Sequence, residues 1–292
     1  MSNDHAQPPP SPKPSPSELS GVSERLHYVR HEGAGPFALL VHGALGSRSY
    51  WADNVAALAQ VCRPVVVELW GHGRSPSPTQ ISAYHPEAYV EQFERIREDL
   101  GAEQWVTIGQ SMGAALTLRY GLTHPERVLA QVVTNSSSAF SEPQVWLRTQ
   151  SSTAEPFADQ VEQRGTGILA DSWVNPGRSR RVSAETRAKL AEEFSEHQAL
   201  GIANSLRYTN GGLPIGDRLA EVRAPTLLTL GVDEEAFAAL VPRARLIPAL
   251  EVAEMAAAHA VNAQAPGPWN EAAVAFLRRV LAGSAADEGK RP

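Results

Sequence analysis

The feature that most constrains the fold of this chain is a serine between two glycines, at the junction of a strand-like run and a helix-like run. Residues 106–108 read Val-Thr-Ile, residues 109–113 read Gly-Gln-Ser-Met-Gly, and residues 114–118 read Ala-Ala-Leu-Thr-Leu. A sharp turn from strand to helix strains the backbone of the central serine, and glycine is needed two residues away on either side because larger side chains would clash. The pattern therefore predicts that the Ser111 hydroxyl stands clear of a sheet edge, beside backbone donors at a helix N-terminus.

Short apolar runs recur along the chain and alternate with helix-like segments. Between the runs, apolar residues repeat at helical spacing, most clearly in residues 86–100 and 273–281. Continuous apolar strands bounded by glycine suit a sheet that is buried on both faces. The chain is therefore predicted to be α/β, with a mostly parallel twisted sheet and helices on both faces. The predicted strands are residues 37–41, 65–69, 106–109, 128–134, 226–230 and 250–255.

One long segment interrupts this alternation. Residues 137–222 contain helical patches and glycine-proline punctuation but no clear strand, which predicts a helical cap inserted into the core. The core is then divided into residues 19–136 and residues 223–282. Residues 1–18 are rich in proline and serine and predict a disordered tail, and residues 283–292 predict a flexible C-terminal tail.

Charge and cysteine content exclude several classes of function. The 292 residues carry a formal net charge of -6 and form no basic stripe, so nucleic acid is not an expected partner. Cys62 is the only cysteine, which excludes a disulfide within the chain and argues against a zinc cluster. No apolar run is long enough to span a bilayer and the N-terminus lacks the layout of a signal peptide, so we expect a cytoplasmic protein without a membrane partner.

The serine turn resembles that of the α/β-hydrolase superfamily, and three further segments agree. Residues 41–46, VHGALG, resemble the family's oxyanion loop, and residues 68–75, ELWGHGRS, resemble its DLxGHGxS turn with Glu68 in place of the usual aspartate. Residues 258–261 resemble its late histidine loop. The resemblance spans about residues 21–282 and is weakest in the cap. It implies an α/β-hydrolase fold of the branch with a serine nucleophile and a helical cap, which includes esterases, lactonases and C–C hydrolases.

The resemblance also assigns candidate catalytic residues, because the triad of this fold follows the order serine, acid, histidine along the chain. Ser111 is then the nucleophile. Of the nine histidines, His259 alone follows the strand that should carry the acid, which makes it the base. Two acids stay open. The spacing after Gly231 favours Glu234, whereas the family's usual aspartate favours Asp233.

The motifs also suggest which groups meet the substrate. The resemblance implies an oxyanion hole formed by the backbone N–H groups of Ala44 and Met112. The candidate substrate-contacting residues are His42, Gly43, Leu45 and Gln110 in the core and Trp146 and Trp173 in the cap.

Together these residues predict a serine hydrolase that acts on a small-molecule substrate. The expected reaction is cleavage of a carboxylic ester or lactone of a small, largely apolar substrate through an acyl-enzyme on Ser111, with no cofactor and no metal. A serine at this turn argues against the family branches that use an aspartate nucleophile. Two alternatives stay open: hydrolysis of a C–C bond in a β-diketone-type substrate, and a ligand receptor that retains the triad.

Overall fold

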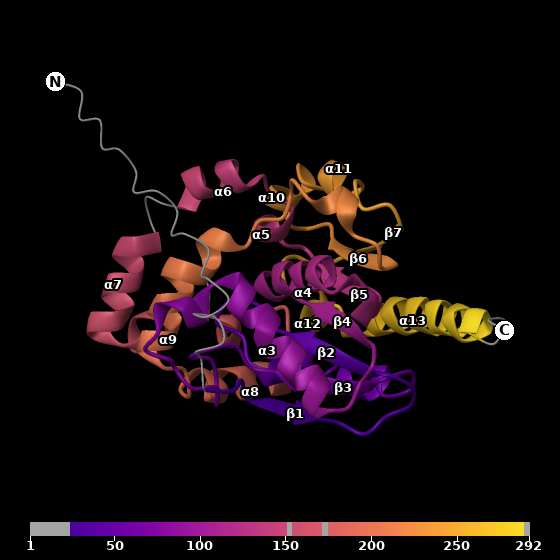
Figure 1. The fold of residues 1–292 in the computed structure, drawn as a ribbon. Coiled ribbons are helices and arrows are strands. Elements are labelled where there is room, and N and C mark those ends of the chain that lie inside the picture. The colour runs from indigo at the N-terminus through magenta and orange to yellow at the C-terminus, as the bar shows by residue number, and fades with distance from the viewer. Residues whose placement is uncertain (1–23, 151–153, 171–174, 289–292) are drawn as a thin grey trace.

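In the computed structural model, the described residues are 24–150, 154–170 and 175–288, and they form one seven-stranded sheet flanked by helices (Figure 1). The strands are β1 (Tyr28–Arg30), β2 (Phe37–Val41), β3 (Arg63–Val67), β4 (Trp105–Gly109), β5 (Val128–Thr134), β6 (Thr226–Gly231) and β7 (Leu250–Met255). Their order in the sheet is β1-β3-β2-β4-β5-β6-β7. β1 is antiparallel to β3, and all other neighbouring pairs are parallel. The predicted α/β class with a mostly parallel sheet is confirmed.

Helices cover both faces of the sheet because its strands are apolar on both sides. Leu39 and Val41 of β2 belong to the apolar cluster that holds α3 (Pro86–Asp99) and α4 (Met112–Thr123). Ala38 and Leu40, which point the other way, belong to the cluster that holds α2 (Val55–Leu58) and α13 (Pro266–Glu288). All five residues of β2 are buried. The central strand therefore reads as a continuous apolar run, as expected for a parallel sheet covered on both faces.

The topology creates one favoured place for a ligand. After β3 the chain crosses to the other side of β2 and forms β4, so the strand order reverses between β2 and β4. In open α/β sheets, ligands bind beyond the carboxyl ends of the strands at such a switch point. The loop after β2 begins at His42, and the turn after β4 contains Gln110 and Ser111. The motifs that suggested a reactive serine thus meet where the topology favours a site.

Between β5 and β6, the described part of residues 137–222 forms helices and no strand. One apolar cluster in this segment also takes in Leu45 from the loop after β2. The helix α7 packs against α9, and Figure 1 shows both beyond one end of the sheet. The helices are α5 (Ser137–Phe140), α6 (Pro143–Gln150), α7 (Ala154–Arg164), α8 (Ala184–Phe194) and α9 (Ala199–Asn204), with short turns η4 (Thr166–Leu169), η5 (Pro176–Arg178), η6 (Ser205–Thr209), η7 (Asn210–Gly212) and η8 (Leu219–Glu221).

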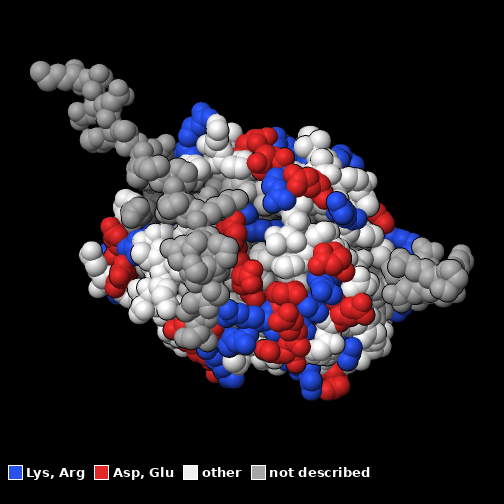
Figure 2. Space-filling view, in the orientation of Figure 1, with Lys and Arg blue, Asp and Glu red and all other residues white. Residues whose placement is uncertain are grey.

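The remaining elements are short, apart from the last helix. α13 runs to Glu288, past the point where the flexible tail was predicted to begin, and the predicted N-terminal tail lies outside the described residues. The described helices include none that combines the length and the apolar character needed to cross a membrane. Acidic and basic side chains are intermixed on the face seen in Figure 2. The short elements are η1 (Arg48–Trp51), η2 (Ile81–Tyr84), η3 (Pro125–Arg127), α10 (Glu235–Ala238), α11 (Val241–Ala244) and α12 (Val261–Gln264).

Candidate active site

The turn between β4 and α4 has the strained geometry that its sequence predicts. Ser111 adopts φ 53° and ψ -115°, and Leu45 is the only other non-glycine residue of the described chain with a positive φ. A Cβ on Gly109 would lie 2.4 Å from the carbonyl oxygen of Gly113, and one on Gly113 would lie 2.1 Å from that of Val41. Neither glycine can be replaced without moving the backbone, so the close packing of this turn against β2 holds Ser111 in its conformation.

Three of the predicted residues meet at the carboxyl edge of the sheet. The Nε2 atom of His259, in the loop between β7 and α12, lies 2.7 Å from the Oγ atom of Ser111. Its Nδ1 atom lies 2.8 Å from the Oε1 atom of Glu234, which follows β6. The His259 side chain is 46% exposed and that of Glu234 is 19% exposed. The arrangement is a serine, an imidazole and a carboxylate in one hydrogen-bonded line that solvent can reach.

The charge of Glu234 suits a partner for an imidazole N–H. Burial raises the pKa of this carboxyl, but hydrogen bonds from His259 and Asn135 and attraction to the charge of His259 hold the pKa below its usual value. The group is therefore ionised at neutral pH and accepts the Nδ1–H of His259. That leaves the Nε2 lone pair directed at the Ser111 hydroxyl, which is the tautomer that can take its proton.

The second candidate acid points elsewhere. The Oδ2 atom of Asp233 lies 2.7 Å from Nη1 of Arg181, and both side chains are about half exposed. Its backbone N–H donates to the carbonyl of Ala257 at 2.9 Å, which fixes the turn that sends the next side chain inward. Of the two acids that the sequence left open, the structure places Glu234 and not Asp233 at His259.

The two predicted oxyanion donors flank the serine. Met112 is the first residue of α4, and Ala44 lies in the loop after β2. Neither backbone N–H donates a hydrogen bond within the described chain. Gly43 brings this loop close to the turn, because a Cβ there would lie 2.9 Å from the Cβ of Ser111. Two uncommitted N–H groups beside a nucleophile can hold an oxyanion.

His42 does not fit its predicted contact with substrate. Its side chain is completely buried, its Nδ1–H donates to the carbonyl of Gly43 at 2.7 Å, and its Nε2 accepts from the N–H of Leu69 at 3.1 Å. With both ring nitrogens used by the backbone, His42 is unavailable to a ligand. The motif located His42 correctly in the loop after β2, but the buried ring supports this loop through its bonds to the backbone of Gly43 and Leu69.

The other predicted contacts divide between the core and the 137–222 segment. Leu45 is buried in the apolar cluster of that segment, and its N–H donates to Nε2 of His72 at 3.2 Å. Gln110 is buried beside the serine, and its Nε2 donates to the carbonyl of His259 at 3.4 Å. Trp146 is partly buried, and its indole N–H donates to the carbonyl of Asn210 at 2.8 Å, which ties α6 to η7. Trp173 lies outside the described residues.

A buried carboxylate from α8 holds the loop after β2. Glu193 accepts hydrogen bonds from the hydroxyls of Ser47 and Ser49 and from the backbone N–H of Ser49 at 3.0 Å. Its Oε1 also lies 3.1 Å from Nε of Arg48, whose Nη1 in turn lies 2.9 Å from Oε1 of the fully buried Glu68. A single side chain of the 137–222 segment thus contacts the last residue of the loop that carries Ala44 and the first two residues of η1.

Sequence reasoning missed Glu193 and the polar residues at the end of β5. Thr134, Asn135 and Ser136 are fully buried and contact the serine turn or Glu234. A signal was present, because the last residue of this buried strand and the two residues after it are all polar, at the edge where the triad was expected. Glu193 had no such signal, since it resembles any acid on an amphipathic helix.

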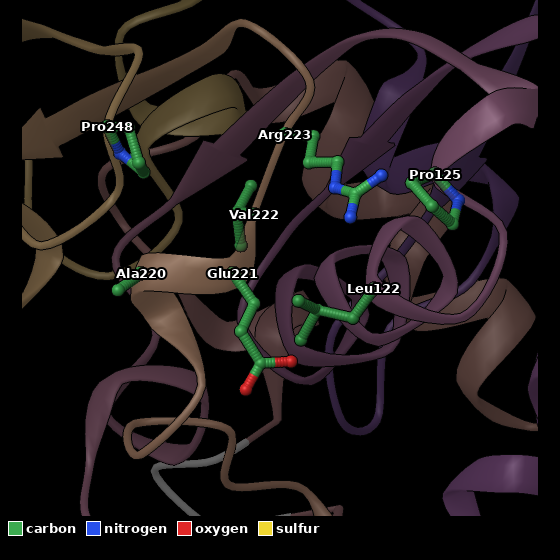
Figure 3. A pocket seen from close by; sticks show the side chains of 7 residues that line it. All are labelled: Leu122, Pro125, Ala220, Glu221, Val222, Arg223 and Pro248. Carbon is green, nitrogen blue, oxygen red and sulfur yellow. The ribbon is translucent and has the colours of Figure 1, made fainter.

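A pocket of about 540 Å³ lies away from these residues (Figure 3). Pro125, Arg223 and Pro248 line it, and each shortly precedes the first residue of β5, β6 or β7. The pocket therefore lies at the amino ends of these strands, opposite the serine. In the part of the chain that the structure describes, no group of His, Cys, Asp and Glu side chains is arranged to hold a metal ion.

Comparison with known proteins gives matches over most of the chain. Residues 39–211 match the family model described as alpha/beta hydrolase fold. The chain is 25% identical over 275 residues to the putative 2-succinyl-6-hydroxy-2,4-cyclohexadiene-1-carboxylate synthase of Bacillus subtilis, covering 89% of this chain and 97% of that protein. It is 28% identical over 168 residues to the chloroplastic protein PHYLLO of Arabidopsis thaliana, which covers 55% of this chain but only 10% of that protein.

Two solved structures share its architecture. MenH from S. aureus superimposes with a TM-score of 0.77 and 18% identity, covering 87% of this chain and 99% of that one. The enol-lactonase from Burkholderia xenovorans LB400 superimposes with a TM-score of 0.73 and 22% identity, covering 87% and 96%. At these identities the likeness shows the fold alone.

Proposed function

Because this chain belongs to the α/β-hydrolase family, we propose that it is a serine hydrolase that cleaves a carboxylic ester or lactone of a small, largely apolar substrate. The observation that carries the proposal is the contact of 2.7 Å between His259 Nε2 and Ser111 Oγ, with Glu234 on the other side of the imidazole. A hydroxyl becomes a nucleophile when an adjacent base can take its proton and a third group orients that base.

The proposed reaction has two halves. His259 takes the proton of Ser111 as Oγ attacks the substrate carbonyl, and the N–H groups of Ala44 and Met112 hold the resulting oxyanion. His259 then gives the proton to the leaving alkoxide, which leaves an acyl group on Ser111. Water attacks this ester, His259 takes a proton from the water, and the acid departs as that proton returns to Ser111. Glu234 stabilises the imidazolium in both halves.

A second candidate uses the same residues on a different bond. The relative from Bacillus subtilis matches almost end to end and is named for a synthase of a cyclohexadiene carboxylate, not for an esterase. In this chain, His259 and Ser111 would then act as a base that removes a proton from a carbon atom of the substrate. Alternatively, Ser111 would attack a ketone so that a C–C bond breaks. Only cleavage of an ester, lactone or C–C bond by attack of Ser111 passes through an acyl group on Ser111.

The test is a Ser111→Ala variant assayed on a panel of aryl esters, lactones and β-diketones. We expect hydrolysis of the best ester or lactone to fall by about 10⁴-fold or more, and labelling by a fluorophosphonate to disappear. Ser195→Ala, which removes an exposed hydroxyl at the end of α8, is the matched control and keeps both activities. Hydrolysis by Ser111→Ala at near the wild-type rate contradicts the proposal. If the wild-type protein turns over diketones but not esters, the second candidate is favoured. If the wild-type protein binds the compounds without turnover, a receptor is favoured.

A further inference from the structure

Three consecutive residues at the end of β5 contact both partners of the imidazole. Thr134 Oγ1 accepts from the backbone N–H of Ser111 at 3.3 Å, and Ser136 Oγ donates to the backbone carbonyl of Ser111 at 2.7 Å. Asn135 Nδ2 donates to Oε2 of Glu234 at 2.7 Å. β5 lies between β4 and β6 in the sheet, and successive residues of an extended chain point in opposite directions. The residues on either side of Asn135 thus reach the serine turn, while Asn135 reaches the acid.

Two backbone groups of Gly231 set the orientation of the Asn135 side-chain amide. Its Oδ1 accepts from the N–H of Gly231 at 3.0 Å, and its Nδ2 donates to the carbonyl of Gly231 at 2.9 Å. Only one orientation of the amide satisfies both backbone groups, because the oxygen must face the N–H and the nitrogen must face the carbonyl. In that orientation the second N–H of the amide is directed at Glu234.

This N–H addresses a difficulty specific to a glutamate at this position. Glutamate has one more rotatable bond than the aspartate usual in the family, so its carboxylate has more orientations to lose on positioning an imidazole. Asn135 holds Oε2 and His259 contacts Oε1, so the two oxygens have separate partners. Asn135 and its neighbours Thr134 and Ser136 are completely buried, so water does not reach these three side chains, whereas the Glu234 side chain is 19% exposed.

We propose that Asn135 is a positioning residue that acts through Glu234, holding its carboxylate in the one orientation that supports His259. The proposal rests on the function proposed for Ser111, His259 and Glu234. It differs from a purely structural role, in which the amide would only join the ends of β5 and β6. The two roles give different results when Glu234 is absent, because a residue that acts through Glu234 then has nothing to position.

The experiment is a double-mutant cycle on hydrolysis of an aryl ester, with Asn135→Ala, Glu234→Ala and the double variant. We expect Asn135→Ala to lower kcat/KM by about 10- to 100-fold in the presence of Glu234, through kcat and not KM, as for loss of a hydrogen bond to a charged group. In the Glu234→Ala background the same change should cost less than about 2-fold. Equal losses in both backgrounds, or a loss under about 2-fold with Glu234 present, overturn the proposal.

Gln131→Ala is the matched control, because it removes another fully buried amide from the same strand. Gln131 Nε2 donates to the carbonyl of Thr117 at 3.0 Å, away from Glu234. It should lower the melting temperature and change kcat/KM by the same factor in both backgrounds. If Asn135→Ala does not fold, Asn135→Ser runs the same cycle. Full activity of Ser111→Ala would remove the proposed function itself, whereas loss of activity there with an additive cycle overturns only the role of Asn135.

Discussion

The two sides of the proposed active site are held by different chemistry and by different parts of the chain. The serine and acid side is held by neutral side chains at the end of β5, namely Thr134, Asn135 and Ser136. The oxyanion side is the loop after β2, which carries the proposed donor Ala44. It is held by a charged carboxylate, Glu193, and by the ring of His197, both from the 137–222 segment. The first set lies at and just beyond the carboxyl end of β5, next to the ends of β4 and β6 that precede Ser111 and Glu234, whereas the second reaches across from an inserted segment.

The difference indicates which side can change independently. Strand β5 is fixed on both edges by β4 and β6, which holds the residues at its end that contact Ser111 and Glu234, although Ser136 also caps α5 at the start of the 137–222 segment. The loop after β2 is not paired as a strand, and Glu193 and His197 of the 137–222 segment contact it. His197 donates from Nε2 to the carbonyl of Leu45 at 3.2 Å and accepts at Nδ1 from Gly73, so it joins this loop to the turn after β3. A shift of the segment should disturb the oxyanion side first.

The largest expected effect tests the serine and acid side. Glu234→Gln should lower kcat on an aryl ester by about 10³- to 10⁴-fold, because a neutral amide can stabilise neither the required tautomer nor the imidazolium. Asp233→Asn changes the adjacent carboxylate, which pairs with Arg181, and should stay within about 3-fold of wild type. The comparison is made by steady-state kinetics at pH 7.5. A larger loss for Asp233→Asn than for Glu234→Gln would reassign the acid.

The next effect tests the oxyanion side. Glu193→Ala removes the acceptor of three hydrogen bonds and one partner of Arg48, and should lower the free energy of unfolding by about 3 kcal/mol. Because Arg48 keeps Glu68, the loss is smaller than for a charge left wholly unpaired. We expect kcat to fall by about 10- to 100-fold as the loop carrying Ala44 loosens.

Glu192→Ala, an exposed neighbour on the same helix, is the control and should change unfolding by less than about 0.5 kcal/mol. Urea denaturation and steady-state kinetics measure both quantities. If Glu193→Ala lowered stability but left kcat unchanged, the 137–222 segment would not position the oxyanion donors, and the contrast between the two sides would disappear.

A third prediction uses acid to separate the two sides. Burial lowers the pKa of His42 to about 4, and the pKa values of His72 and His197 are also held below their ordinary value, chiefly by burial. The unfolded chain therefore binds more protons than the folded one between pH 6.5 and 4. The stabilisation is complete above about pH 6.5 and is lost as the pH falls toward 4. At pH 5 the lowered pKa of His42 alone reduces the free energy of unfolding by about 2 kcal/mol.

All three rings support the loops after β2 and β3, so acid should open the oxyanion side before the serine turn. Hydrogen exchange at pH 5 and pH 7.5, corrected for intrinsic rates, should show a greater loss of protection in residues 42–49 than in residues 109–113. Equal losses in the two segments would mean that the three histidines do not hold one side selectively.

The sheet was largely predictable because burial on both faces leaves a continuous apolar run in the sequence. All six runs that predicted strands correspond to β2 through β7, although β3 lies two residues earlier than predicted. β1 was missed because it has three residues, none fully buried, and pairs only at the edge of the sheet. A strand so short and so exposed carries no periodic signal. The extension of α13 to Glu288 was missed because a polar terminal turn resembles a tail.

The candidate site was predictable only where a local motif carries the geometry. Gly109 and Gly113 predict the serine turn because no larger residue fits at either position. The spacing after Gly231 favoured Glu234 over Asp233 as the acid, and Glu234 contacts His259. Hydrogen bonds between residues far apart in the sequence leave no comparable motif. The bond from Asn135 to Glu234 spans 99 residues, and that from Ser49 to Glu193 spans 144. The sequence could show polar residues there, but not which of them would meet.

The smallest expected effect sharpens the comparison at Ser111. Thr134→Val keeps the shape of a buried side chain but removes the acceptor of the Ser111 N–H. At 3.3 Å this bond is long, and the positive φ of Ser111 is also held by the packing of Gly109 and Gly113. We therefore expect kcat to fall by about 3- to 10-fold, equivalent to about 1 kcal/mol.

Thr229→Val is the matched control, because Thr229 is the register partner of Thr134 on β6 and is equally buried. Its hydroxyl donates to the carbonyl of Val133 at 3.2 Å and accepts from the indole of Trp269, so its loss should lower the melting temperature without changing kcat. Thermal melts and the rate of fluorophosphonate labelling separate the two effects, since labelling reports the nucleophilicity of Ser111 directly. Equal labelling rates for Thr134→Val and wild type would mean that the glycines alone fix the serine, and that β5 contributes to this side only through Asn135 and Ser136.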